Sequence, residues 1–281
     1  MKKVGLVLEG GGIRGAFTAG ALAWLADQNI QFDYYVGISS GAIYLVIHLA
    51  KQKKIAYDLA TKYSIDPDIV GVKAFLKEGH FVAYRKLFEE DLKKKAHLNV
   101  QELIKENLPI EVGCYVLEHG KTEYFPVESD LTTVIASASL PIVGSVCKYK
   151  GLHLLDGGVT KMIPIERAVE QGCTHFLVIT TKAKDYVRKP SSRFVKWLIK
   201  ILYHAYPQIA KDYAVRHINY YRQKELIQKY INEGKAINIY PTVNVPVSRF
   251  KGSVSQAKQL YQLGYQNMAE RKEEILKLIK K

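Results

Sequence analysis

Two glycine-rich turns, each placed between a short apolar run and a helical pattern, constrain the fold of this chain most. The first covers residues 9–15, Glu-Gly-Gly-Gly-Ile-Arg-Gly, and follows the apolar run 4–8. The second covers residues 37–41, Gly-Ile-Ser-Ser-Gly, and follows the apolar run 34–36. Glycine permits sharp reversals and close backbone approaches that a side chain would block. Two buried strands that each lead through such a turn into a helix predict a sheet covered by helices.

The same alternation continues to about residue 180. Helical patterns at 16–28 and 42–50 are followed by a helical region at 55–108 and by strand patterns at 111–118 and 121–127, which His119 and Gly120 join as a hairpin. A helix at 131–139, a helix at 165–172 and a strand at 175–180 complete the series, and residues 148–155 lead into Asp156-Gly-Gly158. We expect a three-layer α/β/α sandwich with a mostly parallel central sheet. The character of the sequence changes near residue 182, so we expect an α/β domain at 1–182 and a basic, mainly helical C-terminal domain at 183–281.

The positive charge is confined to the last third of the chain. The whole sequence has 41 lysine and arginine residues against 27 acidic residues, a net charge of +14. Residues 1–180 hold 20 of each, whereas residues 181–281 hold 21 basic and 7 acidic residues. This asymmetry indicates an anionic partner, such as peripheral contact with an anionic membrane. Nucleic acid is not expected, because the basic region has no recognisable nucleic-acid-binding motif.

Residues 193–203 form an amphipathic helical pattern within this basic region. Arg193, Lys196 and Lys200 share one face, and a second face is apolar, with Phe194, Trp197, Leu198 and Ile201. Such a helix suits the surface of an anionic membrane. Apolar helix faces more often pack on protein, and we expect that arrangement here.

The N-terminal sequence and the cysteines indicate the cellular compartment in which the protein is expected. The apolar run 4–8 ends at Glu9, too early for the roughly 7–15 apolar residues of a secretory signal, and no run approaches the roughly 18 residues of a membrane span. Cys114, Cys147 and Cys173 are an odd, widely spaced set, which favours free thiols in a reducing compartment. We therefore expect a cytoplasmic protein, peripheral to a membrane at most. No metal is expected, because His, Asp and Glu do not cluster with ligand spacing.

The two turns also contain groups with possible chemical roles. Successive glycine amides at 10–12, followed by a helix N-terminus, can hold a phosphate or a developing oxyanion. Gly37-x-Ser-x-Gly41 is the nucleophile-elbow pattern, which raises Ser39 above the sheet and directs the Ser40 amide to the same space. A serine there also serves commonly as a helix N-cap. The first turn fits a dinucleotide fingerprint too, but that fold needs an acidic residue at the end of the second strand, and Asp33 precedes that strand.

A third motif, Asp156-Gly-Gly158, supplies a carboxylate. Within hydrogen-bond reach of Ser39, such a carboxylate accepts the hydroxyl proton. Taken alone, an aspartate before two glycines is more often a turn residue. A hydrolase with a Ser-His-Asp triad needs a histidine after the acid. His175, His204 and His217 follow Asp156, but none lies in a loop motif.

In this order, the three motifs resemble those of the patatin-like phospholipase family. The resemblance covers residues 4–180 and includes Ala136-Ser-Ala-Ser-Leu-Pro141 shortly before the aspartate. It implies hydrolysis of lipid acyl esters by a dyad of Ser39 and Asp156 without histidine. No cofactor is expected. The resemblance also implies an oxyanion hole that contains, with the Ser40 amide, Gly10, Gly11, Gly12 and Arg14. Two alternatives stay open: an acyltransferase that uses the same dyad, and a non-catalytic protein that binds anionic lipid.

Overall fold

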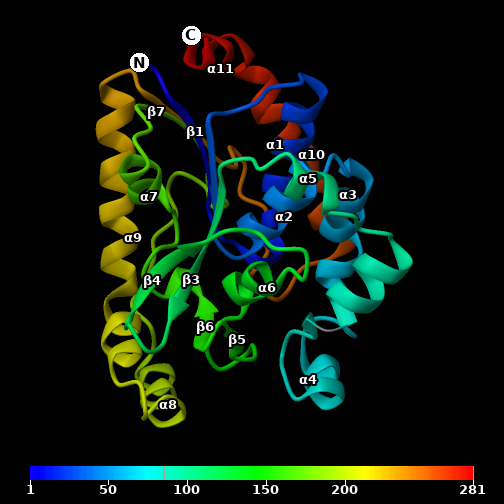
Figure 1. The fold of residues 1–281 in the computed structure, drawn as a ribbon, viewed down its shortest axis with the longest axis vertical. Helices are drawn as coiled ribbons and strands as arrows, with labels where there is room; N and C mark the ends of the chain where they lie inside the picture. The colour runs from blue at the N-terminus through cyan, green and yellow to red at the C-terminus, as the bar shows by residue number, and fades with distance from the viewer. Residues whose placement is uncertain (85, 281) are drawn as a thin grey trace.

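The computed structural model describes residues 1–84 and 86–280 and shows an eight-stranded sheet with helices on both faces (Figure 1). The strand order is β5-β6-β3-β2-β1-β7-β8, and β4 pairs with β3 off this path. The strands are β1 (Val4–Leu8), β2 (Tyr34–Gly37), β3 (Ile110–Val116), β4 (Lys121–Phe125), β5 (Cys147–Tyr149), β6 (Leu152–Asp156), β7 (His175–Ile179) and β8 (Ala236–Ile239).

The helices follow the strands in the alternation that the sequence predicts. They are α1 (Gly15–Asp27), α2 (Ser40–Leu49), α3 (Lys53–Thr61), α4 (Val72–Glu78), α5 (Gln101–Lys105), α6 (Thr132–Ala138), α7 (Ile165–Glu170), α8 (Arg193–Leu202), α9 (Gln208–Asn232), α10 (Val254–Glu270) and α11 (Lys272–Ile279). The segment Lys86–Lys95 is π-helical.

The centre of the sheet is parallel. Strands β3, β2, β1, β7 and β8 pair in parallel, whereas β4, β5 and β6 form the antiparallel pairs. This confirms the predicted three-layer fold with a mostly parallel sheet. Because parallel strands end at the same edge, β1 and β2 bring the two glycine turns side by side.

Strand β1 shows why the sequence folds into three layers. All five of its residues are buried. Leu6 and Leu8 pack in the core under α1, α2 and α3, while Val7 packs in the core on the opposite face with residues of α7 and α9. A strand buried on both faces reads as a continuous apolar run, which is why residues 4–8 mimic the start of a signal sequence.

The C-terminal third continues the same sheet. Strand β8 pairs in parallel with β7, with Phe176 opposite Ala236 and Ile179 opposite Ile239. Helices α9, α10 and α11 form the expected helical appendage, with α9 and α10 on opposite sides of the sheet (Figure 1). The sequence did not predict β8, because its four residues carry too short a pattern to identify a strand. The division at 182/183 marks a change of sequence character, and the sheet extends across it.

Helix α8 differs from expectation. We expected its apolar face to pack on the protein. Ile199 is buried, but Phe194, Trp197 and Ile201 are exposed to solvent, so the expectation is wrong for these three side chains. All three cysteines are free. None of the helices in the described part of the chain combines the length and apolar character needed to cross a bilayer.

The contact between α1 and α10 leads to a prediction about stability. A Cβ added at Gly264 would lie 2.0 Å from the carbonyl oxygen of Phe17, so the two helix backbones must separate to admit it. We expect Gly264→Ala to lower the free energy of unfolding by about 1–3 kcal/mol, as overpacking usually does. Gln262→Ala, on the exposed face of the same helix, should change it by less than about 0.5 kcal/mol. Urea unfolding measures both variants, and equal stabilities would contradict the close packing.

Candidate active site

Ser39 lies in the sharp turn between β2 and α2. Its backbone has φ 57° and ψ −129°, a conformation that non-glycine residues rarely adopt. The flanking glycines are required by close contacts. A Cβ at Gly37 would lie 2.8 Å from the amide nitrogen of Ala42, and a Cβ at Gly41 would lie 2.8 Å from the carbonyl oxygen of Glu9. The Gly-x-Ser-x-Gly spacing therefore reflects backbone packing on both sides of the serine.

Ser137 supports this turn from below. Its hydroxyl accepts a hydrogen bond from the Ser39 amide at 3.0 Å and donates one to the carbonyl oxygen of Gly113 at 2.7 Å. Two residues later, the carbonyl oxygen of Ser139 accepts from the Asp156 amide at 2.8 Å. The segment 136–141 thus positions both Ser39 and Asp156. The sequence singled this segment out, but not these hydrogen bonds.

Asp156 ends β6 and is almost completely buried. Its Oδ1 accepts from the Gly158 amide at 2.6 Å, and Gly157 has no room for a side chain because a Cβ would lie 2.4 Å from the Gly113 carbonyl oxygen. Burial raises the pKa of Asp156, and the Gly158 amide, the charge of Arg249 and a hydrogen bond from the Ser39 side chain offset part of this rise. The structure therefore brings a basic carboxylate next to the Ser39 hydroxyl.

The first two glycines of the 10–12 loop shape the space beside Ser39. A Cβ at Gly10 would lie 2.8 Å from the Cβ of Ser39, so only glycine fits there. The Gly10 amide donates to the carbonyl oxygen of Met162 at 3.3 Å, and the Gly11 amide donates to the Ser40 hydroxyl at 2.9 Å. Both amides are already engaged within the protein.

The remaining amides beside Ser39 are those of Gly12 and Ser40. Within residues 1–84 and 86–280, neither N–H has a hydrogen-bond acceptor. Gly12 has φ +61°, and the backbone of Arg249 packs against it, with the Arg249 carbonyl oxygen accepting from the Ile13 amide at 3.1 Å. Because Gly12, Ser40 and Ser39 line the same cavity, these two amides are available to an oxygen atom near the serine.

Arg14 does not join this group through its side chain. Its Nε donates to the carbonyl oxygen of Val247 at 3.1 Å, and its side chain lines a different cavity from those that contain Ser39. The structure thus brings together Ser39, Asp156 and the glycine loop, but places the Arg14 guanidinium against the C-terminal third.

An apolar cavity of about 80 Å³ opens beside Ser39. Its walls are mostly aliphatic and aromatic side chains from α2, α3 and the segment 69–87. They include Ile43, Leu59, Ile69, Val70, Val82 and Leu87.

A second, smaller cavity, of about 20 Å³, adjoins Ser39 and Asp156 and is lined by four cationic side chains. These are Lys182, Arg188, Arg216 and Arg249. Arg216 comes from α9 and is 5% exposed; its guanidinium donates to the Gly158 carbonyl oxygen at 2.7 Å, while its Nε has no partner among the described residues. Burial lowers the pKa of Arg216 to about 10.

Sequence reasoning missed this cationic cavity. The available signal was the basic excess after residue 180, which we assigned to the surface. Part of the positive charge is buried in the protein, where Lys182 forms an ion pair with Glu9. The buried Glu9 carboxylate also accepts a hydrogen bond from the Thr181 amide at 2.6 Å. Burial lowers the pKa of Lys182 to about 8. Glu9 is therefore a structural anchor for the segment after β7.

Histidine is absent from the walls of both cavities in the part of the chain that the structure describes. His175 begins β7, at the opposite end of that strand from the glycine turns. Within the same part of the chain, no three His, Cys, Asp or Glu residues gather as metal ligands would.

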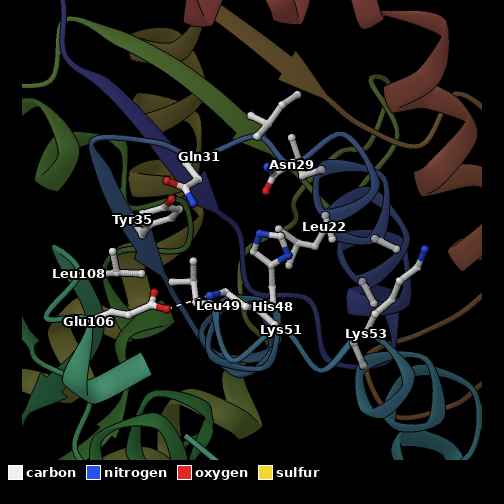
Figure 2. Close-up of a pocket in the computed structure, with 16 residues that line it drawn as sticks. Leu22, Asn29, Gln31, Tyr35, His48, Leu49, Lys51, Lys53, Glu106 and Leu108 are labelled. Carbon is white, nitrogen blue, oxygen red and sulfur yellow. Dashed lines mark hydrogen bonds and ion pairs between the residues drawn. The ribbon is translucent and has the colours of Figure 1, made fainter. Parts of the chain in front are cut away.

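A larger cavity, of about 350 Å³, lies elsewhere, between α1, α2 and α3 (Figure 2). His48, Tyr35 and Leu22 line it, with Lys51 and Glu106 paired at its rim. Burial lowers the pKa of His48 to about 4, so the ring is neutral at pH 7. None of the predicted site residues reaches this cavity, so its size does not make it the candidate active site.

Comparisons with known proteins agree with the motifs. A family model described as patatin-like phospholipase matches residues 6–169, and one described as a domain of unknown function (DUF6363) matches residues 206–280. The chain is 26% identical over 215 residues to the uncharacterized protein YjjU of Escherichia coli K12, which covers 70% of this chain and 57% of YjjU. The chain therefore spans less than two thirds of that relative. Among solved structures, VipD from Legionella pneumophila superposes with a TM-score of 0.49 at 13% identity, covering 96% of this chain and 66% of VipD.

Proposed function

This chain belongs to the patatin-like phospholipase family, and on that premise we propose that it is a serine lipid acyl hydrolase with Ser39 as nucleophile and Asp156 as general base. One observation carries the proposal: a buried, basic carboxylate lies beside a serine in a strained turn, with no histidine lining the described site. Family membership supports the general activity on lipid acyl esters. The roles of individual residues are argued below from their contacts.

Acylation begins when Ser39 attacks the ester carbonyl carbon and Asp156 takes the hydroxyl proton. Negative charge develops on the carbonyl oxygen of the substrate. The unengaged amides of Gly12 and Ser40 donate hydrogen bonds to it. When the tetrahedral intermediate collapses, the leaving alcohol takes the proton from Asp156, and Ser39 keeps the acyl group as an ester.

Deacylation repeats these steps with water. Asp156 takes a proton from the attacking water, the same amides hold the second oxyanion, and the proton passes to Ser39 as the fatty acid leaves. Gly10 and Gly11 contribute by their lack of side chains, since their amides are already bonded. Arg14 has a structural role in this scheme, because it holds the segment at Val247. An alcohol in place of water would give acyl transfer, and product analysis distinguishes the two reactions.

The two cavities beside Ser39 indicate how a substrate lies. The apolar cavity takes the acyl chain. The cationic cavity takes an anionic group near the ester, such as the phosphate of a glycerophospholipid. Among the described residues four cationic side chains line it, whereas Asp156 is the one carboxylate in its lining and Glu9 pairs with Lys182. Burying this excess charge is costly, and an anion offsets that cost. The unpartnered Nε of Arg216 is a free donor at this site.

Substitution of the dyad tests the proposed function. Ser39→Ala should abolish hydrolysis of a soluble ester and labelling by a fluorophosphonate probe, because the nucleophilic oxygen is gone. Asp156→Asn, which keeps the shape but cannot accept the proton, should lower kcat by at least about 100-fold. Asp185→Asn, at an exposed position, is the matched control and should retain the wild-type rate. Unchanged hydrolysis by Ser39→Ala would refute the proposal.

The pH dependence of hydrolysis tests the role of Asp156. Only the ionised carboxylate accepts a proton, so kcat/KM should rise with pH as Asp156 ionises, at a pH above the ordinary aspartate pKa of 3.8. Arg249 lowers this pKa, so Arg249→Gln should move the rise to higher pH. Arg193→Gln, on exposed α8, should leave its midpoint unchanged. A shift to lower pH in Arg249→Gln would contradict the assignment.

The cationic cavity predicts substrate preference. Arg188→Gln should lower kcat/KM for a glycerophospholipid by about 10-fold, the effect of losing roughly 1.5 kcal/mol of charge-assisted hydrogen bonding. Hydrolysis of a neutral p-nitrophenyl ester should be nearly unaffected. Lys272→Gln removes one positive charge at an exposed position on α11, at the opposite end of the molecule, and serves as the control. Equal losses on both substrates would remove the head-group assignment while leaving the dyad intact.

A further inference from the structure

The exposed phenylalanine and tryptophan side chains of the described residues all lie on two helices, α4 and α8. Phe75 on α4 is 52% exposed, and Phe194 and Trp197 on α8 are 65% and 56% exposed. Aliphatic side chains beside them are exposed as well: Val72, Leu76, Ile201 and Leu202. Gathered apolar side chains on a protein surface mark a site of interaction.

Both helices lie at the same end of the molecule. In Figure 1, α4 and α8 project at the bottom, on either side, while the two termini and α11 lie at the top. Strand β1 starts beside the N-terminus and runs toward the half that carries these two helices. Their end of the molecule is therefore the end at which the parallel strands lead into the candidate active site.

Helix α4 is attached directly to the wall of the apolar cavity. It projects from a loop whose base is closed by a bridge between Val70 and Val82 and by a 2.8 Å hydrogen bond from the Gly71 amide to the Phe81 carbonyl oxygen. Val70 and Val82 both line the apolar cavity. The exposed face of α4 thus lies beyond the rim of that cavity.

Helix α8 is attached in the same way to the cationic cavity. Arg188, which lines that cavity, precedes the start of α8 by five residues. The Tyr203 hydroxyl, just after α8, accepts from the Ile142 amide at 3.2 Å, and the carbonyl oxygen of Val143 accepts from the Phe81 amide at 2.8 Å. Leu140, in this same short segment, lines both cavities. One stretch of chain therefore connects the two helices to the place where the two cavities adjoin, and we call this place the mouth.

The stretch of sequence that contains α8 carries only positive charges. Between residues 187 and 211 the chain has six lysine and arginine residues and no aspartate or glutamate. They are Arg188, Lys189, Arg193, Lys196, Lys200 and Lys211. Aromatic and aliphatic side chains accompanied by unopposed basic residues complement an anionic lipid surface.

We propose that α4 and α8 together dock the protein on an anionic lipid bilayer and hold the mouth of both cavities against it. The apolar side chains of both helices enter the head-group region, and the basic residues of α8 bind lipid head groups. Because α4 and α8 lie on either side of the mouth, both helices can contact one extended surface such as a bilayer. The choice of a membrane as the occupant rests on the proposed lipid hydrolase function.

Trp197 provides the direct measurement. The chain has two tryptophans, and Trp24 is buried, so a change in emission on binding reports Trp197. The full chain carrying Ser39→Ala is mixed with vesicles of phosphatidylglycerol and phosphatidylcholine, or of phosphatidylcholine alone. We expect sedimentation with the mixed vesicles and a blue shift of emission, both weakened by salt.

Paired variants identify the surface. Phe75→Ser with Leu76→Ser, and separately Phe194→Ser with Ile201→Ser, should each lower the apparent affinity for mixed vesicles at least 10-fold. Leu276→Ser is the control, since this leucine is exposed on α11 at the opposite end of the molecule. With Ser39 intact, both pairs should hydrolyse a soluble neutral ester at the wild-type rate, which also shows that they fold.

Absence of binding to the mixed vesicles would overturn the proposal, as would equal binding by the paired variants. Binding that does not depend on phosphatidylglycerol would contradict the proposal that the bilayer must be anionic. If size-exclusion chromatography shows a dimer that both pairs disrupt, and vesicles do not bind, the surface joins two copies of this chain instead. None of these results bears on the dyad, which the soluble ester tests separately.

Discussion

The close approach of the turns after β1 and β2 is the constraint on which the site depends. The Gly41 backbone lies against the carbonyl oxygen of Glu9, and Gly10 lies against the Cβ of Ser39. A side chain at either glycine would separate the turns, and the Gly12 and Ser40 amides would no longer face one space. The strained backbone of Ser39 persists because this packing and the Ser137 hydroxyl fix it from two sides.

The second organising feature is buried charge. Glu9 and Lys182 form an ion pair under the glycine loop, and Arg216 reaches the Gly158 carbonyl oxygen beside Asp156. Charges buried in this way cost free energy unless each is paired. These two contacts therefore tie the C-terminal third to the rest of the chain through the site itself. An excess of cations is left facing the serine, which is why we assign an anionic group of the substrate to that cavity.

Much of the fold could be predicted because its signals are local. The residues of β1 form a continuous apolar run, and Gly37 and Gly41 bracket a serine at the start of a helix. Other features had no local signal. Strand β8 has four residues and becomes a strand by pairing with β7. The apolar face of α8 was expected to pack on protein because most such faces do, and nothing in residues 193–203 shows that the sheet is already covered by α9.

The sequence by itself determined the three-layer fold, the two turns and the identity of the serine and aspartate motifs. Each of these depends on the backbone conformation of a few neighbouring residues. Glycine at fixed positions indicates where that conformation leaves no room for a side chain. Only the tertiary structure decided which amides stay unengaged beside Ser39, where the Arg14 side chain lies, and that Arg188, Arg216 and Arg249 surround the site. These depend on contacts between segments far apart in the sequence, such as Gly10 with Met162 and Arg14 with Val247. Packing sets the geometry of such contacts, and the residue pattern of a single segment does not show it.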